Sequence, residues 1–198
     1  SEAADVVIDF SNPVCLDDML AYCIEKKLPA VICTTGYSPE QVAQIKEASK
    51  KIAIFYSGNM SLGINLLIEL SKKVFGESFD IEIIEKHHNQ KLDAPSGTAL
   101  MIADAITEYA KNDAQYVYDR HAYRKKRDKR EIGIHAVRGG NIVGEHEVLF
   151  AGTDELFTIS HSARSKSVFA VGAVNAAVYM NGQSAGMYDM SDLLSAQN

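Results

Sequence analysis

The fold is decided by the stretch that begins with Val6-Val7-Ile8-Asp9-Phe10 and ends with Ile52-Ala53-Ile54-Phe55-Tyr56. Both runs are short and largely apolar, as is Pro29-Ala30-Val31-Ile32-Cys33 between them, and such runs are typical of strands buried in a parallel sheet. Amphipathic segments, 16–27 and 38–51, separate the three and are predicted as helices, the second capped by Ser38. This strand–helix alternation predicts an α/β fold with a Rossmann-like parallel sheet.

The middle of the chain predicts a second, α+β lobe with a mixed or antiparallel sheet. Segment 60–75 has a helical apolar period, 79–85 alternates as a strand, and 87–93 reads as a polar loop. Pro95-Ser96-Gly97-Thr98 opens a helix that runs to about Ala110, and the charged stretch 111–130 reads as a loop.

Three alternating runs follow, at 131–138, 142–151 and 155–163, with Gly-containing turns between them. Their pattern predicts an antiparallel meander. Residues 168–180 are small and apolar at helical spacing, so we expect a helix there that packs back on the first lobe.

Composition narrows the class of protein. The 198 residues are 46% hydrophobic and 23% charged, with a net charge of -6, which is ordinary for a globular protein and unfavourable for nucleic-acid binding. No apolar run reaches the roughly 20 residues of a membrane span. The three cysteines, Cys15, Cys23 and Cys33, show no CxxC spacing. An odd number of thiols favours reduced cysteines and a cytoplasmic location.

The stretch from Glu85 to Ala99 carries the chemistry: Glu85-Lys86-His87-His88-Asn89-Gln90-Lys91-Leu92-Asp93-Ala94-Pro95-Ser96-Gly97-Thr98-Ala99. Histidine exchanges protons near neutral pH, and lysine adds a positive charge that can also donate a proton. Asp93 or Ser96 can cap the helix, and the N–H groups of Gly97 and Thr98 would then point at a bound anion. The pattern therefore predicts an anion site beside an acid–base group, suited to a small carboxylate.

This stretch resembles the E-x-H-H-x-x-K-x-D-A-P-S-G-T-A signature of the dihydrodipicolinate reductases. Other segments are similar to the same family in the same order, so the resemblance spans essentially the whole chain: Asp9-Phe10-Ser11-Asn12-Pro13, Thr34-Thr35-Gly36, Gly58–Gly63 and Val137–His146. The family reduces a cyclic dicarboxylate with NADH or NADPH, yielding 2,3,4,5-tetrahydrodipicolinate for diaminopimelate and lysine synthesis.

The resemblance implies roles for residues of this chain. His87 would be the acid–base residue and Lys91 the proton donor, while His88, Gly97 and Thr98 would hold the substrate carboxylates. The nicotinamide side of the cofactor would be lined by Thr34, Thr35, Gly36, Ser57, Gly58, Asn59 and Met60. Residues 1–57 with 168–198 would form part of a dinucleotide-binding domain, and 58–167 a substrate-binding domain that assembles a homotetramer.

Two features depart from the family pattern. The family opens with a strand and a G-x-x-G-x-x-G turn that holds the cofactor pyrophosphate, whereas the only glycine before Pro39 here is Gly36. We therefore expect a shortened form of a longer chain, weak NADH or NADPH binding, and an exposed sheet edge. Lys166 stands where family members commonly carry arginine, and Val171 replaces a usually small or polar residue, so substrate anchoring by Lys166 is not expected.

Other motifs have simpler interpretations. The basic run 124–130 lacks interleaved aromatics and is interpreted as a solvated loop rather than a nucleic-acid site. Glu145 and Glu147 share one strand face while His146 points away, so no metal site is expected. Ser96 lacks the G-x-S-x-G context of a hydrolase nucleophile. Two hypotheses remain open: a nicotinamide-dependent reductase, or a non-catalytic module that binds dicarboxylates or supports assembly.

Overall fold

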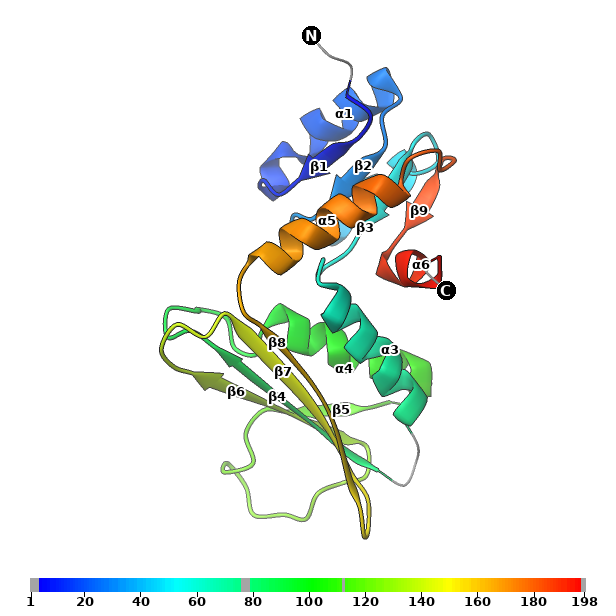
Figure 1. Ribbon diagram of the computed structural model, residues 1–198. Coiled ribbons are helices and arrows are strands. Elements are labelled where there is room, and N and C mark those ends of the chain that lie inside the picture. Colours follow the sequence, from blue (N-terminus) through cyan, green and yellow to red (C-terminus); the bar gives the residue numbers. More distant parts are fainter. Residues whose placement is uncertain (1–3, 76–78, 112, 197–198) are drawn as a thin grey trace. The chain divides into compact units, whose positions relative to one another are not determined.

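A computed structural model describes residues 4–75, 79–111 and 113–196 of the chain (Figure 1). The chain divides into two compact units, one formed by residues 1–65 with 167–198 and the other by residues 66–166. None of the described helices is long and apolar enough to cross a bilayer.

The first unit contains the predicted parallel sheet. Its strands are β1 (Val7–Asp9), β2 (Ala30–Ile32), β3 (Ala53–Tyr56) and β9 (Gly186–Tyr188), hydrogen-bonded in the order β1-β2-β3-β9 and all parallel. The strand–helix alternation of residues 6–56 is thus confirmed. Strand β9 comes from the tail, which the sequence left unassigned because a three-residue strand carries almost no periodicity.

Two helices cover one face of this sheet. They are α1 (Leu16–Lys26), which follows the short 3-10 turn η1 (Pro13–Cys15), and α2 (Pro39–Ala48). Ser38 caps α2 as predicted, within a capping box that it shares with Gln41. The buried cluster between these helices and the sheet includes Leu16, Leu20, Cys23, Ile32, Ile45 and Ile54.

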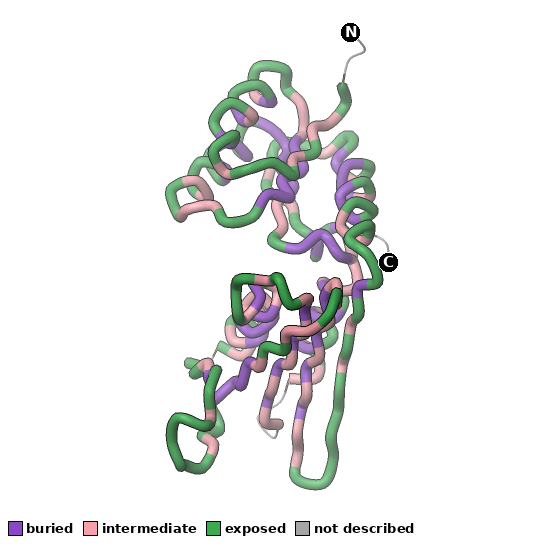
Figure 2. Tube along the Cα trace, turned by 90° about the vertical axis from the view of Figure 1, so that its left-hand side faces the viewer, coloured by how far each residue is buried: buried purple, intermediate pink, exposed green. Residues whose placement is uncertain are grey.

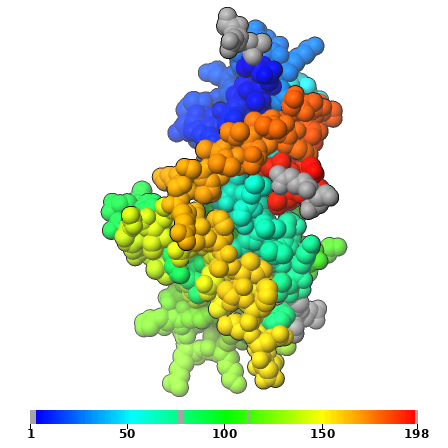
Figure 3. All heavy atoms as spheres, in the orientation of Figure 1, coloured from blue at the N-terminus to red at the C-terminus, as the bar shows by residue number. Residues whose placement is uncertain are grey.

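Helix α5 (Ser167–Tyr179) packs against β1 and β2, which confirms the expected return of the last long helix to the first lobe. It shares a second buried cluster with the sheet and with α6 (Met190–Ser195), including Phe55, Met60, Ala173, Ala176 and Leu193. The remaining side of α5 lies at the surface (Figure 3), where Val171, Val174 and Val178 are exposed.

The second unit is a five-stranded mixed sheet in the order β5-β6-β4-β7-β8. The strands are β4 (Asp80–His87), β5 (Gln115–Val117), β6 (Glu131–Arg138), β7 (Gly144–Ala151) and β8 (Leu156–Ala163). Helix α4 (Gly97–Ala110) packs on β4 and buries Ala99, Ile102, Ala103 and Ile106, while α3 (Leu62–Val74) links the two units. Along β4 buried and half-buried positions alternate (Figure 2).

The predicted antiparallel meander of three strands is wrong. Strand β4 lies between β6 and β7, paired parallel with the first and antiparallel with the second, so that only β7 and β8 form a hairpin. The turn after β6 passes over the end of β4, where the Gly139 amide donates to the His87 carbonyl and the Asn89 amide donates to the Gly140 carbonyl. Alternation identifies strands but not their partners, which is why the sequence did not reveal this insertion.

Two boundaries also differ from the prediction. His87 is the last residue of β4 rather than the first of a loop, and the predicted loop 111–130 contains β5. The basic part of that loop is held by acidic side chains: Arg120 and Arg127 both bond to Glu82. Lys125 and Arg120 lower the pKa of the buried Glu131 to about 2. The basic run is therefore partly a structural element of the sheet edge.

The contact between α5 and the segment after β3 gives a stability prediction. An added Cβ at Gly172 would lie 1.7 Å from the carbonyl oxygen of Met60. Helix propensity alone would make Gly172→Ala stabilising by roughly 1 kcal/mol. Because the clash is with backbone, we expect instead that the free energy of unfolding falls by about 1–3 kcal/mol in urea titrations.

The matched control is Val174→Ala on the same helix, since Val174 is 55% exposed. It should change the free energy of unfolding by no more than about 0.5 kcal/mol. A Gly172→Ala chain as stable as the unaltered one would show that α5 does not pack this tightly on the Met60 segment.

Candidate active site

The functional loop runs from the end of β4 to the start of α4. Ser96 is the N-cap of α4, because its side-chain oxygen accepts a hydrogen bond from the Ala99 amide at 3.2 Å. Of the two capping residues considered from the sequence, the structure uses Ser96. The cap fixes the first turn of α4, and the Ser96 amide at its start donates to Glu85 near the end of β4.

A buried carboxylate, Glu85, joins this loop to the sheet. Its side chain has no exposed surface and accepts two hydrogen bonds from the Arg138 guanidinium, at 2.7 and 2.8 Å. The Ser96 amide donates to it at 3.0 Å, and His87 Nδ1 lies 2.6 Å from Oε2. Burial acts to raise the pKa of Glu85, but these donors outweigh it and hold that pKa below its usual range. Glu85 is therefore an ionised, fully bonded group at neutral pH.

Two imidazole rings lie side by side at the end of the strands. The ring centroids of His87 and His146 are 5.3 Å apart and the planes meet at 74°. His146 Nε2 is 3.1 Å from the hydroxyl of Ser96. Burial, and then the neighbouring His87, lower the pKa of His146 from 6.5 to about 4. His146 is consequently neutral at physiological pH.

Lys91 and the start of α4 converge on one carboxylate. Lys91 Nζ lies 2.8 Å from Asp93 Oδ1, and the bond from Lys91, together with the Gly97 amide, holds the pKa of Asp93 below its usual range. Asp93 is exposed, and an added Cβ at Gly97 would meet nothing within 4 Å. The loop thus has an accessible position at which an ammonium group and a helix amide hold a carboxylate.

The remaining predicted substrate residues lie in the same loop. Thr98 follows Gly97 in the first turn of α4 and is half-buried. His88 is half-buried and accepts a hydrogen bond from the Lys91 amide through its carbonyl oxygen. Within the described residues, the structure brings His87, Lys91 and the α4 amides into one region, whereas no bond joins the His88 imidazole to the others.

In the first unit, predicted cofactor residues lie at the carboxyl end of β2. The Thr34 hydroxyl is buried and donates to Asp9 Oδ2 at 2.8 Å, so that its side chain holds this edge together. Thr35 and Gly36 are exposed, and Gly36 has a φ of 84° with open space around it. A ligand can therefore approach the backbone here, at the edge where parallel α/β sheets bind nucleotides.

The segment after β3 lies at the same sheet edge. Ser57 is half-buried and Gly58 exposed, whereas the Asn59 side chain accepts from the Ser61 amide at 2.8 Å. The Met60 side chain belongs to the core under α5. Of this predicted segment, only Ser57 and Gly58 leave side chain or backbone accessible at the edge.

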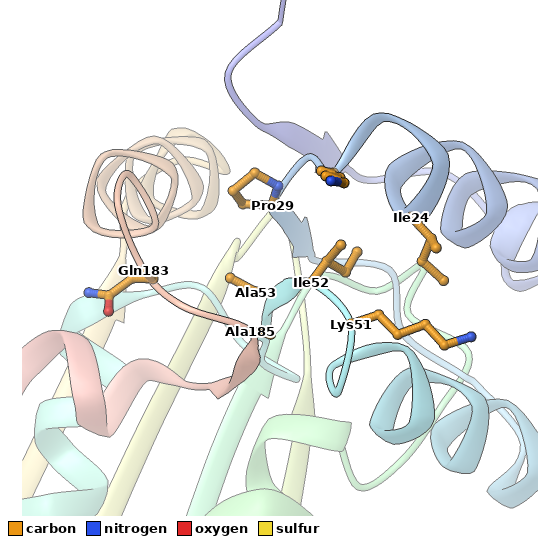
Figure 4. Close-up of a pocket in the computed structure, with 8 residues that line it drawn as sticks. Ile24, Pro29, Lys51, Ile52, Ala53, Gln183 and Ala185 are labelled. Carbon is orange, nitrogen blue, oxygen red and sulfur yellow. The ribbon is translucent and has the colours of Figure 1, made fainter.

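A cavity of about 350 Å³ lies at the opposite, amino-terminal edge of the same sheet, next to Pro29 and Ala53 (Figure 4). Lys27 and Lys51, which line it, follow the carboxyl ends of α1 and α2. Cations complement the helix dipole at such positions. The lysines thus have a structural explanation, and the cavity is remote from the predicted cofactor residues of the first unit.

Three residues of the site had no role from sequence: Glu85, Arg138 and His146. Glu85 is part of the family signature, but its role depends on Arg138, which is 53 positions away and lies directly opposite His87 in the ladder between β4 and β6. His146 points away from Glu145 and Glu147, as the alternation predicted, and the described residues contain no group of three potential metal ligands.

The lowered pKa of His146 gives a pH prediction. The unfolded chain takes up the extra proton between about pH 6.5 and pH 4, so the free energy of unfolding should fall as the pH is lowered through that window. At pH 5 the loss is on the order of 2 kcal/mol. In urea unfolding at pH 7 and pH 5, His146→Gln should lose less stability than the unaltered chain.

His121→Gln is the control, since His121 is exposed in the loop before β6. It should keep the pH dependence of the unaltered chain. If His146→Gln keeps it too, the buried imidazole does not carry the effect.

Comparisons with known proteins agree with this architecture. Two family models, described as the N-terminus and the C-terminus of dihydrodipicolinate reductase, match residues 1–60 and 63–194. A 4-hydroxy-tetrahydrodipicolinate reductase of Clostridium tetani is 54% identical over 99% of this chain and 78% of its own length. A reductase of the same name from Caldanaerobacter subterraneus is 55% identical over 98% of this chain and 78% of its own length.

Solved structures are similar as well. A dipicolinate-bound dihydrodipicolinate reductase from Paenisporosarcina has a TM-score of 0.76 at 28% identity, covering 93% of this chain and 71% of its own. An amine dehydrogenase from Mycobacterium smegmatis, at 11% identity and a TM-score of 0.59, shares the fold alone, with 96% and 75% covered. From the two family models and the relatives above 50% identity, the chain belongs to the dihydrodipicolinate reductase family.

Proposed function

We propose that this oxidoreductase converts 4-hydroxy-tetrahydrodipicolinate to 2,3,4,5-tetrahydrodipicolinate at the expense of NADH or NADPH, a step of diaminopimelate and lysine synthesis. Relatives above 50% identity carry the name of that reductase. A structural relative holds dipicolinate, which is a cyclic dicarboxylate like the proposed substrate.

The observation that carries the proposal is the carboxylate position formed by Lys91 and the start of α4. In this structure Asp93 takes that position. A substrate carboxylate would displace it and gain the same ammonium and amide partners, in a protein whose net charge of -6 otherwise repels anions. Gly97 and Thr98, with His88, are the residues that we propose to hold the two carboxylates.

The proton steps are proposed for His87 and Lys91. Loss of water needs a proton on the departing hydroxyl group, and hydride addition leaves an electron-rich ring position that must take up a proton. His87 lies at the end of β4 and Lys91 four residues later, on the side of the loop where the carboxylate is held. His87 would be the acid–base residue that exchanges a proton with the substrate ring, and Lys91 would be the second proton donor.

When bound, a reduced nicotinamide nucleotide supplies the hydride. The open backbone at Thr35 and Gly36 and the accessible Ser57 and Gly58 fit one part of such a cofactor. The chain contains no Gly-rich strand-to-helix turn for a pyrophosphate, so we propose that these 198 residues bind NADH and NADPH weakly. The division into a dinucleotide-binding unit and a substrate-binding unit is part of this proposal.

We further propose a homotetramer assembled through the second unit. Helix α4 covers one face of its sheet, and the opposite face carries half-buried and exposed positions that include Val137 and Leu156. A sheet face of this kind can be covered by a second copy.

A cytoplasmic location is proposed from the cysteines. All three are free thiols, and burial raises the pKa of Cys23 to about 11 and that of Cys33 to about 12, which leaves these two buried thiols unreactive. Reduced thiols are usual in the cytosol.

Replacing the proposed proton donors tests the reaction itself. NADH or NADPH consumption with the hydroxylated substrate should fall by roughly 10²- to 10⁴-fold in His87→Ala and in Lys91→Ala. His121→Ala and Lys129→Ala, at exposed positions outside the site, should keep full activity.

If both site variants keep full turnover, the assignment of roles is wrong. If the unaltered chain binds pyridine-2,6-dicarboxylate in calorimetry but shows no turnover even at high cofactor concentration, the chain is a non-catalytic dicarboxylate-binding module.

The helix amide can be tested with a proline. Gly97 is the first residue of α4, where proline fits the helix but has no N–H, and Ser96 already has the extended ψ of 149° that proline requires before it. Gly97→Pro should weaken pyridine-2,6-dicarboxylate binding by about 10- to 100-fold, as expected for a lost bond to a charged group.

Gly97→Ala is the matched control, because it keeps the amide and its Cβ meets nothing within 4 Å. Its affinity should stay within about threefold of the unaltered chain. Equal affinities for the proline and alanine variants would show that the Gly97 amide does not contact the dicarboxylate.

A further inference from the structure

We propose that Glu85, held by Arg138, is the positioning residue of His87: it fixes the ring with the proton on Nδ1 and leaves Nε2 as the nitrogen that exchanges protons with the substrate. The proposal rests on the proposed function for its catalytic consequence, but its structural part can be measured on the chain without substrate.

The tautomer follows from the hydrogen bond. His87 Nδ1 lies 2.6 Å from Glu85 Oε2. An ionised carboxylate can only accept, so the bond requires a hydrogen on Nδ1, and in the neutral ring Nε2 then carries the lone pair. The Glu85 side chain has no exposed surface, so it cannot touch a bound substrate. It acts on the reaction through His87.

Arg138 keeps this carboxylate from moving or taking the proton. Its two terminal nitrogens bond to the two carboxylate oxygens, and one of them also donates to the Asp93 carbonyl at 2.8 Å. The Ser96 amide adds a further donor. Glu85 thus has fixed donors from β6 and from the start of α4, and the bond to Glu85 occupies Nδ1 of His87 while Nε2 lies outside this cluster.

Gly144 lies beside the other end of the ring. His87 Nε2 would lie 3.2 Å from a Cβ added at Gly144, the first residue of β7. A side chain at this position would therefore crowd Nε2. The charged and titratable groups around the ring are Glu85 on its own strand, Arg138 on β6 and His146 on β7, and Lys91 on the loop acts electrostatically on His146.

Glu85→Gln is the informative change, because it preserves shape and removes one acceptor. If the amide oxygen faces Ser96 and one Arg138 nitrogen, the NH₂ meets one Arg138 donor and His87 Nδ1. In the opposite orientation the NH₂ meets two donors, from Ser96 and Arg138. The first orientation has fewer conflicts, and in it the NH₂ donates to Nδ1, which forces the hydrogen to Nε2. The substitution should therefore invert the tautomer.

The experiment combines NMR with kinetics. In the chain with ring-¹⁵N-labelled histidine, assigned by comparison with His87→Gln, His87 should show a protonated Nδ1, and in Glu85→Gln a protonated Nε2. With substrate and cofactor, kcat should fall by about 10²- to 10⁴-fold, as for loss of an orienting carboxylate. The KM for the dicarboxylate should stay within about threefold, since Lys91 and the Gly97 amide, which we propose to hold the carboxylates, are unchanged.

Two further variants separate positioning from folding. Glu145→Gln changes a glutamate on the neighbouring strand that pairs with Lys86 instead, and it should alter neither the tautomer nor kcat. Gly144→Ala should lower kcat by crowding Nε2 while Nδ1 stays protonated. Thermal melting of each variant checks that a lower kcat does not come from a smaller fraction of folded protein.

The outcomes are distinct. Glu85→Gln with an unchanged tautomer overturns the proposal, whether or not kcat falls, and so does an inverted tautomer with full kcat. A third outcome separates the two proposals: His87 is protonated on Nδ1 in the unaltered chain and on Nε2 in Glu85→Gln, but the unaltered chain shows no turnover. That result supports the positioning of His87 and refutes the proposed function.

Discussion

The site depends on one buried ion pair, Glu85 with Arg138. Burying a lone carboxylate costs several kcal/mol, and it is tolerated here because both oxygens are fully bonded. The pair connects three pieces of the chain that are far apart in sequence: the end of β4, the end of β6 and the start of α4. Through it, the position of the loop that carries Lys91 is tied to the sheet register.

Around this pair the chain separates fixed from adjustable groups. Glu85, His146 and Ser96 are buried and bonded to each other or to backbone, whereas Lys91 and Asp93 reach solvent. Rigid partners hold an imidazole in one orientation, while an exposed ion pair can exchange its carboxylate for another with little reorganisation. This arrangement suits the proposed binding of an anionic substrate by a chain whose net charge is -6.

Local signals predicted much of the fold from sequence. Strands β1, β2 and β3, the Ser38 cap and the helix 97–110 follow from apolar period and capping chemistry, which depend on near neighbours, and Ser96 was one of two candidate caps. Strand pairing was not predictable, because the alternation of buried and half-buried residues along β4 is compatible with any neighbouring strand. Strand β5, at three residues, is too short to show a period.

The candidate site was predictable to the same extent. The motif pointed to His87, Lys91 and Gly97, since their chemistry can be read from residue type and from the helix start. The Glu85–Arg138 pair was not predictable, because only the fold places Arg138 opposite His87. Met60 packs in the core and Thr34 bonds to Asp9 through buried side chains. The sequence alone did not separate these buried positions from the exposed ones beside them.

The insertion of β4 between β6 and β7 has a consequence for biosynthesis. Strand β4 leaves the ribosome more than 40 residues before β6 and more than 55 before β7. Until β6 emerges, both edges of β4 lack partners, and until β7 emerges one edge still does. During that time the face that carries Ile81, Ile83 and Glu85 has helix α4 to cover it. Long-range pairing of this kind slows folding and exposes strand edges to association. The nascent chain must therefore remain soluble with its central strand unpaired until β7, near residue 151, has emerged.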